Sequence, residues 1–412
     1  FADDAIKKGA LFSIIDKDCS TKFKNKKIKI KNTFNFFLKI SKNIRKASNI
    51  NSIAITGSSG KTSLKELIGK ILNKIVSTSY SKKSYNNKYG VPLSLFNIQK
   101  KNIFGIFEAG MDRKGEINKL TKLISPNLAI ITNVSYAHIK NFSSLNQIAA
   151  AKSEIIDNVL PGGTIILNRD DQYFNFFKHK ALKKNLKIIS FGKKSNANLS
   201  LIKIKRIKNK YILIIKINKF KKRFIINKSL INQSLNLLAC LAAISNFIDI
   251  KNLRKNIFYN YNLMEGRGNL VKIRKANKVI NIIDESYNSN PLSLKFAVNN
   301  FSKMGVKANQ KNILLGDMLE LGKFSKKLHK QASKIINRSN INKAYVYGNH
   351  IRETFNKIKP QKKGRILINK KQIISLIKND LNNNDYLMIK GSNATGLNDM
   401  INKIKKEQYN AL

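Results

Sequence analysis

An α/β fold built around a mostly parallel sheet is predicted by this sequence, and three observations support that prediction. Short apolar runs alternate with segments of helical periodicity over the first half of the chain. A glycine-rich loop lies between one apolar run, residues 51–55, and the helical segment 63–75. A second alternating set follows residue 268 and indicates a second α/β unit.

The elements of the first set can be predicted in chain order. Residues 5–15 fit a helix that runs into a strand, and residues 34–47 have the apolar spacing of a helix. Residues 201–226 alternate Ile with Lys, which favours antiparallel strands beside the parallel sheet. Further strands are expected at 103–107, 128–131 and 164–167, and further helices at 144–159 and 234–248.

A turn at Glu265-Gly266-Arg267-Gly268 interrupts this pattern, and we expect a domain boundary there. The strands of the second set are expected at 279–283, 312–315, 344–347 and 386–389. The sequence therefore predicts a central unit over 32–268, a C-terminal unit over 269–412 and a short leading segment over 1–31.

The composition sets the charge and the expected compartment. The formal charge is +56, from 79 Lys and Arg against 23 Asp and Glu. The lysines are spread along the chain, and Asn and Ile, which share AT-rich codons with Lys, are abundant; we therefore interpret the charge as codon bias on a solvated surface, not as a nucleic-acid site. Cys19 and Cys240 match no metal-ligand spacing, which favours a reduced, cytoplasmic setting. We expect no membrane insertion and a monomer.

The glycine-rich loop is the strongest chemical signal. It runs from Thr56 through Gly57, Ser58, Ser59, Gly60, Lys61 and Thr62 to Ser63. Backbone N–H groups in such a loop face phosphate oxygens, and the following helix N-terminus adds positive potential. Lys61 is expected to reach the β- and γ-phosphates of ATP, and Thr62 to ligate Mg²⁺. Ile55 occupies the position of the first glycine of the general phosphate loop.

This shorter loop resembles that of the Mur ligase family, and further segments extend the resemblance from about Phe1 to Lys390. The first are Asn86-Asn87-Lys88-Tyr89-Gly90-Val91-Pro92, Glu108-Ala109-Gly110-Met111, Gly115-Glu116-Ile117, Ala137-His138 and Ala151-Lys152-Ser153-Glu154-Ile155. The later, more discriminating ones are Asp284-Glu285-Ser286-Tyr287-Asn288-Ser289-Asn290-Pro291, Gly316-Asp317-Met318-Leu319-Glu320-Leu321-Gly322 and Lys390-Gly391-Ser392. They resemble the branch of the family that adds a dipeptide.

The resemblance implies a reaction and its reactants. It implies an ATP-dependent amide ligase of peptidoglycan precursor synthesis, which joins D-alanyl-D-alanine to UDP-N-acetylmuramoyl-tripeptide through an acyl phosphate. It also implies a central ATPase domain and a C-terminal Rossmann-like domain, with residues 1–31 as the remnant of a domain that binds the UDP-sugar. The carboxylate and the γ-phosphate repel each other, so fixed cations are needed where they meet.

The resemblance also implies roles for single residues. Thr62 and Glu108 would hold one Mg²⁺, while His138 and a carbamylated Lys152 would hold a second. Asn236 would contact adenine, and Arg267, Glu285 and Tyr287 would approach ATP from the domain junction. Lys61, Glu108, His138, Lys152 and Arg267 form the expected catalytic set, and Asn86, Asn87, Asn288, Asn290 and Glu320 are candidates for substrate contacts.

Taken alone, several of these residues have plainer interpretations. Glu108 fits a surface acid, His138 a core or capping histidine, and Lys152 a solvated helix lysine. Asn290 precedes a proline and fits a structural turn.

The sequence departs from the family pattern at three places. Asn232 and Asn393 stand where the family usually has histidine and arginine. The chain also begins without Met, at a point that resembles the end of the family's N-terminal domain. We therefore expect this chain to bind ATP but to bind the UDP-tripeptide poorly, and isothermal titration with that substrate tests the expectation.

Two other interpretations remain open from the sequence. Another ligase of the superfamily, a MurE-type enzyme or a folylpolyglutamate synthase, would keep the reaction and change the substrate. A nucleic-acid-binding P-loop NTPase would account for the +56 charge, and it predicts salt-sensitive binding with stimulated ATPase activity.

Overall fold

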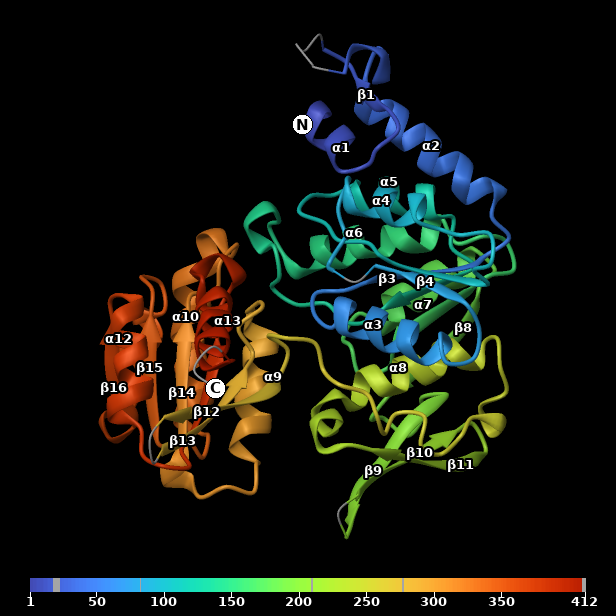
Figure 1. Ribbon diagram of the computed structural model, residues 1–412. Coiled ribbons are helices and arrows are strands. Elements are labelled where there is room, and N and C mark those ends of the chain that lie inside the picture. Colours follow the sequence, from blue (N-terminus) through green and yellow to red (C-terminus); the bar gives the residue numbers. More distant parts are fainter. Residues whose placement is uncertain (18–22, 82, 209, 276–277, 410–412) are drawn as a thin grey trace.

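The computed structural model describes residues 1–17, 23–81, 83–208, 210–275 and 278–409, and these residues form three sheets (Figure 1). The smallest is a parallel pair, β1 (Ser13–Ile15) and β2 (Lys27–Lys29), preceded by α1 (Ala2–Lys7) and followed by α2 (Thr33–Ala47). Cys19 lies outside the described residues. The predicted α/β class is confirmed.

The second sheet has nine strands in the order β11-β10-β9-β8-β7-β6-β3-β5-β4. Strands β3 to β9 pair in parallel, whereas β9, β10 and β11 pair antiparallel, as the Ile–Lys alternation predicted. The strands are β3 (Asn51–Thr56), β4 (Thr78–Tyr80), β5 (Phe104–Glu108), β6 (Leu128–Ile131), β7 (Thr164–Asn168), β8 (Lys187–Gly192), β9 (Leu199–Ile207), β10 (Lys210–Ile217) and β11 (Phe220–Ile226).

Helices cover both faces of this sheet, which explains why its central strands are apolar on both sides. Along β3, Ile53 and Ile55 pack in one buried cluster with α3 and α8, while Ala54 packs in another with α5 and α6. The helices of this unit are α3 (Lys61–Leu72), α4 (Gly90–Phe96), α5 (Glu116–Ile124), α6 (Leu145–Asp157), α7 (Phe174–Lys183) and α8 (Ser234–Ser245).

The third sheet has six strands in the order β12-β13-β17-β14-β15-β16, and all pair in parallel except β12 with β13. The strands are β12 (Asn269–Lys275), β13 (Lys278–Asp284), β14 (Lys311–Gly316), β15 (Lys343–Tyr347), β16 (Lys363–Leu367) and β17 (Tyr386–Lys390). The helices are α9 (Pro291–Ser302), α10 (Ser325–Asn337), α11 (Arg352–Asn356), α12 (Lys370–Ser375) and α13 (Leu397–Tyr409).

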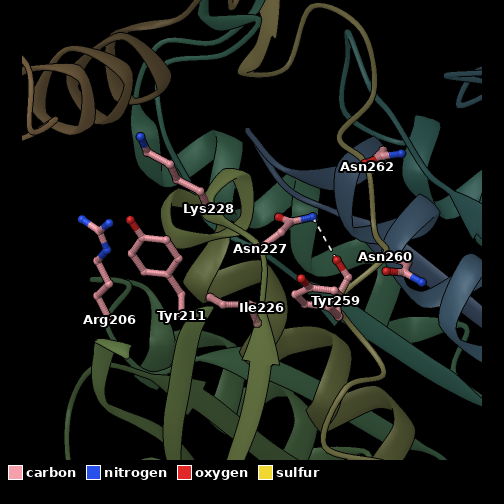
Figure 2. Close-up of a pocket in the computed structure, with 8 residues that line it drawn as sticks. All are labelled: Arg206, Tyr211, Ile226, Asn227, Lys228, Tyr259, Asn260 and Asn262. Atoms are coloured by element: carbon pink, nitrogen blue, oxygen red, sulfur yellow. Dashed lines mark hydrogen bonds between the residues drawn. The ribbon is translucent and has the colours of Figure 1, made fainter. Parts of the chain in front are cut away.

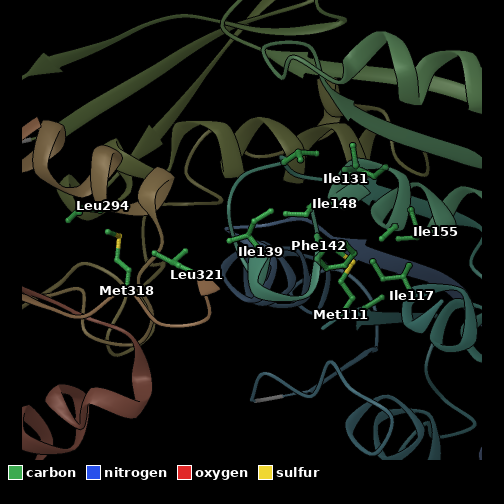
Figure 3. Close-up of a cluster of buried hydrophobic side chains, with 14 of the residues drawn as sticks. Met111, Ile117, Ile131, Ile139, Phe142, Ile148, Ile155, Leu294, Met318 and Leu321 are labelled. Atoms are coloured by element: carbon green, nitrogen blue, oxygen red, sulfur yellow. The ribbon is translucent and has the colours of Figure 1, made fainter. Parts of the chain in front are cut away.

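The loops that follow the strands of the two large sheets meet at a packed junction. One buried cluster includes Ile139 and Phe142 beside the nine-stranded sheet together with Met318 and Leu321 after β14 (Figure 3). The rings of Tyr136 and Phe324 lie 6.4 Å apart across the same junction. The backbone N–H of Lys140 donates to the carbonyl of Glu320 at 3.0 Å, so polar and apolar contacts together fix the loop after β14 against the central unit.

A fully buried histidine supports that loop. The Nε2 atom of His329, on α10, accepts the backbone N–H of Met318 at 3.1 Å, and Nδ1 lies 2.8 Å from the carbonyl of Ser325. This arrangement needs the neutral tautomer with its proton on Nδ1. Burial lowers the pKa of His329, and the nearby His350 lowers it further, against the opposing effects of the Ser325 hydrogen bond, Asp317 and Glu353.

We predict a pH-dependent stability from His329. Because its folded-state pKa lies below the ordinary value, the unfolded chain takes up the proton first, and stability falls as the pH drops below about 6.5. His329→Leu removes the acceptor for Met318 and should lower the free energy of unfolding by about 1–3 kcal/mol at neutral pH. Urea unfolding of both proteins should show this difference shrinking as the solution is acidified. The exposed His179→Gln is the control; a difference that is independent of pH would contradict the prediction.

Among the described residues, no helix is long and apolar enough to cross a membrane.

Candidate functional site

The glycine-rich loop follows β3 and leads into α3, as predicted. Gly57 has a φ of +147°, and a Cβ atom there would lie 1.8 Å from Oγ1 of Thr132. Gly60, the residue before α3, has a φ of +87°. Asn133, which follows β6, accepts the Ser58 N–H with its carbonyl at 2.9 Å and the Ser59 N–H with its side-chain oxygen at 3.0 Å. The neighbouring strand thus fixes the first half of the loop.

The second half of the loop leaves a helix N-terminus without a cap. No side chain caps α3, so the first N–H groups of the helix have no partner inside it. The Lys61 ammonium folds back and donates to the Gly57 carbonyl at 2.8 Å. Burial lowers the pKa of Lys61, an effect that Glu108 and Glu320 oppose and Arg267 reinforces. Free N–H donors beside a half-buried lysine form a site for an anion such as phosphate.

Glu108 ends β5, the strand next to β3, and is buried, which excludes the surface-acid interpretation. Its Oε1 accepts hydrogen bonds from the hydroxyls of Thr62 at 2.9 Å and Ser84 at 3.3 Å. Its Oε2 is buried without a hydrogen-bond partner. A carboxylate oxygen and a hydroxyl close together, with one oxygen unsatisfied, suit a hard divalent cation such as Mg²⁺.

Lys65 supports Glu108 and was not predicted from the sequence. Its side chain on α3 is fully buried, and its ammonium lies 3.8 Å from Oε2 of Glu108 and 3.5 Å from Oε1 of Glu66. The same ammonium donates to the carbonyls of Ser81 and, at 2.8 Å, Lys83. It therefore ties the phosphate-loop helix to the segment that carries Ser84.

Lys152 lies on α6 and is only 2% exposed, which excludes a solvated helix lysine. Among the described residues, no hydrogen bond or ion pair reaches its ammonium. Burial holds its pKa well below the ordinary value, the positive charge of Lys61 lowers it further, and Asp171 opposes both. A lowered pKa favours the neutral, nucleophilic amine over the ammonium ion.

His138 faces two carboxylates from different parts of the chain. Its Nδ1 lies 2.9 Å from Oδ1 of Asp112 and 2.6 Å from Oε2 of Glu320. The three ligand-type atoms lie within 4.8 Å of one another. Among the described residues, no contact joins His138 to Lys152, so the structure does not bring the two expected ligands of a second cation into contact. The close contact with His138 is the main cause that lowers the pKa of Glu320.

The unit that contains the six-stranded sheet contributes a second set of charged side chains. The Arg267 guanidinium lies 4.3 Å from the ring centre of Tyr287, and its Nε is buried without a hydrogen-bond partner. Lys390 is 3.7 Å from Glu285 and donates to the Asn288 carbonyl at 2.8 Å. Burial raises the pKa of Glu285 and lowers that of Lys390, and each residue opposes the shift of the other.

Asn290 connects this unit to the phosphate loop. Its side-chain oxygen caps α9 by accepting the Ser293 N–H at 2.9 Å, and its side-chain nitrogen donates to Oγ of Ser59 at 3.0 Å. The turn interpretation and an inter-unit contact therefore both hold for this residue. Asn236, at the start of α8, lies beside the loop, since its Oδ1 is 3.0 Å from a Cβ built on Gly60.

The remaining predicted substrate residues make contacts within the fold. The Asn86 amide donates to Oγ of Ser84 at 3.1 Å, and Ser84 in turn donates to Glu108, so Asn86 is linked to Glu108 through Ser84. The Asn87 side chain accepts the N–H groups of Tyr89 and Gly90 and so fixes the start of α4. Asn288 is exposed and bonds to the N–H of Ser289.

A separate pocket of about 610 Å³ lies at the antiparallel edge of the nine-stranded sheet (Figure 2). Arg206 and Lys228 line it together with Tyr211 and Tyr259, and Asn227 donates to the Tyr259 carbonyl at 3.3 Å. None of the predicted site residues lines this pocket.

A phosphate loop, a carboxylate on the adjacent strand and cations from a second sheet together define an enzyme that handles nucleotide phosphates. Residues 55–244 match the Mur ligase middle domain, and residues 266–393 match the Mur ligase glutamate ligase domain. The chain belongs to the Mur ligase family, whose members are ATP-dependent, ADP-forming amide ligases.

Individual relatives agree with this assignment. The UDP-N-acetylmuramoyl-tripeptide–D-alanyl-D-alanine ligase of Buchnera aphidicola subsp. Baizongia pistaciae is 32% identical over 413 residues, which cover 100% of this chain and 87% of that protein. The enzyme of the same name from Rickettsia prowazekii is 30% identical over 97% of this chain and 88% of its own length. The crystal structure of MurF from Acinetobacter baumannii has the same fold, with a TM-score of 0.83, 23% identity and coverage of 97% and 86%.

Proposed function

We propose that this chain is the ligase that uses ATP to join D-alanyl-D-alanine to UDP-N-acetylmuramoyl-tripeptide in peptidoglycan precursor synthesis. The observation that carries the proposal is the contact set around Glu108, Thr62 and Lys61, in a chain whose two relatives above both have that activity in their names. These ATP- and UDP-linked substrates would place the reaction in the cytoplasm. We further propose that the enzyme acts as a monomer.

The proposed reaction has two steps. A carboxylate oxygen of the tripeptide attacks the γ-phosphorus of ATP, the bond from that phosphorus to the β,γ-bridging oxygen breaks, and ADP leaves. The dipeptide amine then attacks the acyl carbon, loses a proton, and expels inorganic phosphate as the amide bond forms. Both steps bring anions together, so the chain must supply positive charge in fixed positions.

The chain's own groups meet that need. The uncapped N-terminus of α3 and Lys61 would hold the β- and γ-phosphates, with the Lys61 ammonium leaving the Gly57 carbonyl for phosphate oxygens. Arg267 has a buried guanidinium N–H without a partner, and Lys390 lies close by. Asn290 links the start of α9 to Ser59 and so ties the C-terminal unit to the phosphate loop. Asn236 would lie against the adenine.

The residues fit the expected Mg²⁺. The buried Oε2 of Glu108, which accepts no hydrogen bond from the described residues, and the Thr62 hydroxyl would hold one ion, and a carbamylated Lys152 with His138 would hold another. Such ions neutralise phosphate charge and polarise the phosphorus for attack when bound. Asn86 and Asn288 remain proposed substrate contacts.

We also propose the domain limits 1–31, 32–268 and 269–412. Each of the three sheets lies within one of these ranges, which supports the limits.

A product assay tests the proposed substrate. With ATP, Mg²⁺ and UDP-N-acetylmuramoyl-tripeptide, we expect ADP and an amide product to form with D-alanyl-D-alanine and not with single amino acids. Mass spectrometry of the UDP-linked product distinguishes the two. Product with a single amino acid, or with a folate and glutamate, would instead assign a MurE-type or folylpolyglutamate synthase activity.

A further inference from the structure

The contact of His138 with two carboxylates defines the protonation of its ring. A lone pair on Nδ1 would be repelled by the two carboxylate oxygens that lie 2.6 and 2.9 Å away, although neither contact has the geometry of a hydrogen bond. A hydrogen on Nδ1 makes both contacts attractive. In the neutral ring the lone pair is then on Nε2, which has no hydrogen-bond partner among the described residues.

In the part of the chain that the structure describes, the two carboxylates near His138 are not paired with lysines, although lysines are abundant in this chain. In a chain with 79 Lys and Arg, neither Asp112 nor Glu320 forms an ion pair with a lysine or arginine among the described residues. Asp112 is also held in place: its N–H donates to Glu116 at 2.6 Å, and its carbonyl accepts from the Asn141 side chain at 2.8 Å.

Glu320 reaches His138 from the other unit. It lies in the loop after β14, whose backbone is bonded to Lys140 and whose Met318 and Leu321 belong to the junction cluster (Figure 3). His138 and Glu320 both have left-handed backbones, with φ of 60° and 62°. Such strain in non-glycine residues is held by the surrounding structure and concentrates at functional sites.

We propose that Glu320, with Asp112, positions the His138 imidazole with its proton on Nδ1, so that Nε2 is presented as a metal-ligand atom only when the loop after β14 is docked. Metal-binding histidines commonly donate their other N–H to a carboxylate, which fixes the tautomer and the ring direction. Here one such carboxylate, Glu320, belongs to the C-terminal unit. The orientation of the Nε2 lone pair of His138 toward a metal ion therefore depends on the docking of the two units. The proposal rests on the proposed function only in treating His138 as a cation ligand.

The tautomer can be measured without substrates. In uniformly ¹⁵N-labelled full-length protein at about pH 8, well above the ordinary histidine pKa of about 6.5, long-range ¹H–¹⁵N correlations identify the protonated ring nitrogen of each histidine. The resonances that the wild type shows and His138→Gln lacks belong to the His138 ring. We expect the proton on Nδ1 in the wild type and in Glu320→Gln, which keeps an acceptor oxygen. In the double variant Asp112→Ala/Glu320→Ala we expect a shift towards the Nε2-protonated form.

Kinetics supply a second measurement. Loss of a partner of this kind typically weakens metal affinity by about 10- to 100-fold. Glu320→Ala should therefore raise the Mg²⁺ concentration for half-maximal rate by that factor, while KM for ATP at saturating Mg²⁺ changes little. Glu353→Ala, an acid of the same unit paired with Lys330, is the matched control and should leave both values unchanged.

Three results would overturn the proposal. One is a wild-type His138 protonated on Nε2, and another is an unchanged tautomer in the double variant. The third is Mn²⁺ binding, measured without nucleotide, that both Asp112→Ala and Glu320→Ala abolish, because this would make the three residues direct ligands of one ion. The spectra need no turnover, so a failed product assay beside the expected tautomers would reject only the proposed function.

Discussion

Lys61→Met is expected to lower kcat for ADP formation by about 100- to 1000-fold, the scale on which loss of one preorganised charge contact acts in an active site. The ammonium of Lys61 donates to the Gly57 carbonyl of the phosphate loop, and in the proposed ATP complex it would exchange that carbonyl for a phosphate oxygen. Methionine keeps the length and apolar stem of the side chain and removes only the charge and the donors. Steady-state assays of ADP release with the UDP-tripeptide and dipeptide measure the loss.

Stability gives an independent check on the same variant. Because burial lowers the pKa of Lys61, the folded state disfavours its charged form, and Met should leave the free energy of unfolding equal or higher. Lys70→Met, on the exposed face of α3, is the control and should keep normal activity. A Lys61→Met protein with kcat within about threefold of wild type, or one that unfolds more easily, would contradict this account.

Much of the central unit could be predicted because its signals are local. The apolar runs of β3, β5, β6 and β7 and the glycines of the loop are properties of contiguous residues. Strand β4 was not predicted, since its three residues Thr78–Tyr80 are too short and too polar to show a pattern. β8, β12 and β16 were also missed. Charged residues interrupt the apolar runs of β12 and β16, which are edge strands, whereas β8 has only Lys187 at its start.

The site was predictable where a motif marked it and not where distant residues converge. Glu108 and Thr62 meet because β5 and β3 are neighbours. The sequence predicted a parallel sheet but not this order of its strands. Lys65 could not be distinguished from the other lysines, since only burial reveals its role. Asp112 and Glu320 are 208 positions apart, and their meeting at His138 depends on how two units dock.

Two of the buried lysines near the phosphate loop lie next to carboxylates of opposite charge. Lys65 lies beside Glu108, and Lys390 beside Glu285, so these buried cations have carboxylates within 4 Å. Lys152 is the exception: it is buried, without an ion pair among the described residues, and its pKa is lowered further by Lys61. A cation is therefore poorly placed at this position, whereas an anion there would be attracted by Lys61.

Carbamylation would resolve that mismatch. In that reaction the neutral amine of Lys152 would attack the carbon of CO₂ and lose one proton to solvent, which would convert the side chain into a carbamate of charge −1. The carbamate would attract Lys61 instead of repelling it, and it would offer oxygen atoms suited to Mg²⁺. The lowered pKa of Lys152 supplies the neutral amine that this reaction needs.

We therefore predict that Lys152→Met lowers kcat by about 100-fold or more, because both a metal ligand and a counter-charge to Lys61 are lost. Protein equilibrated with ¹³C-bicarbonate should show one carbamate resonance in ¹³C spectra, which the variant lacks. Lys152→Ala, which leaves space at the site, should regain part of its rate when acetate is added, since acetate can restore the missing carboxylate. Lys183→Met, an exposed lysine on α7, should behave as the wild type. A wild-type spectrum without the resonance, together with normal activity of Lys152→Met, would show that the lysine acts as an amine or has only a packing role.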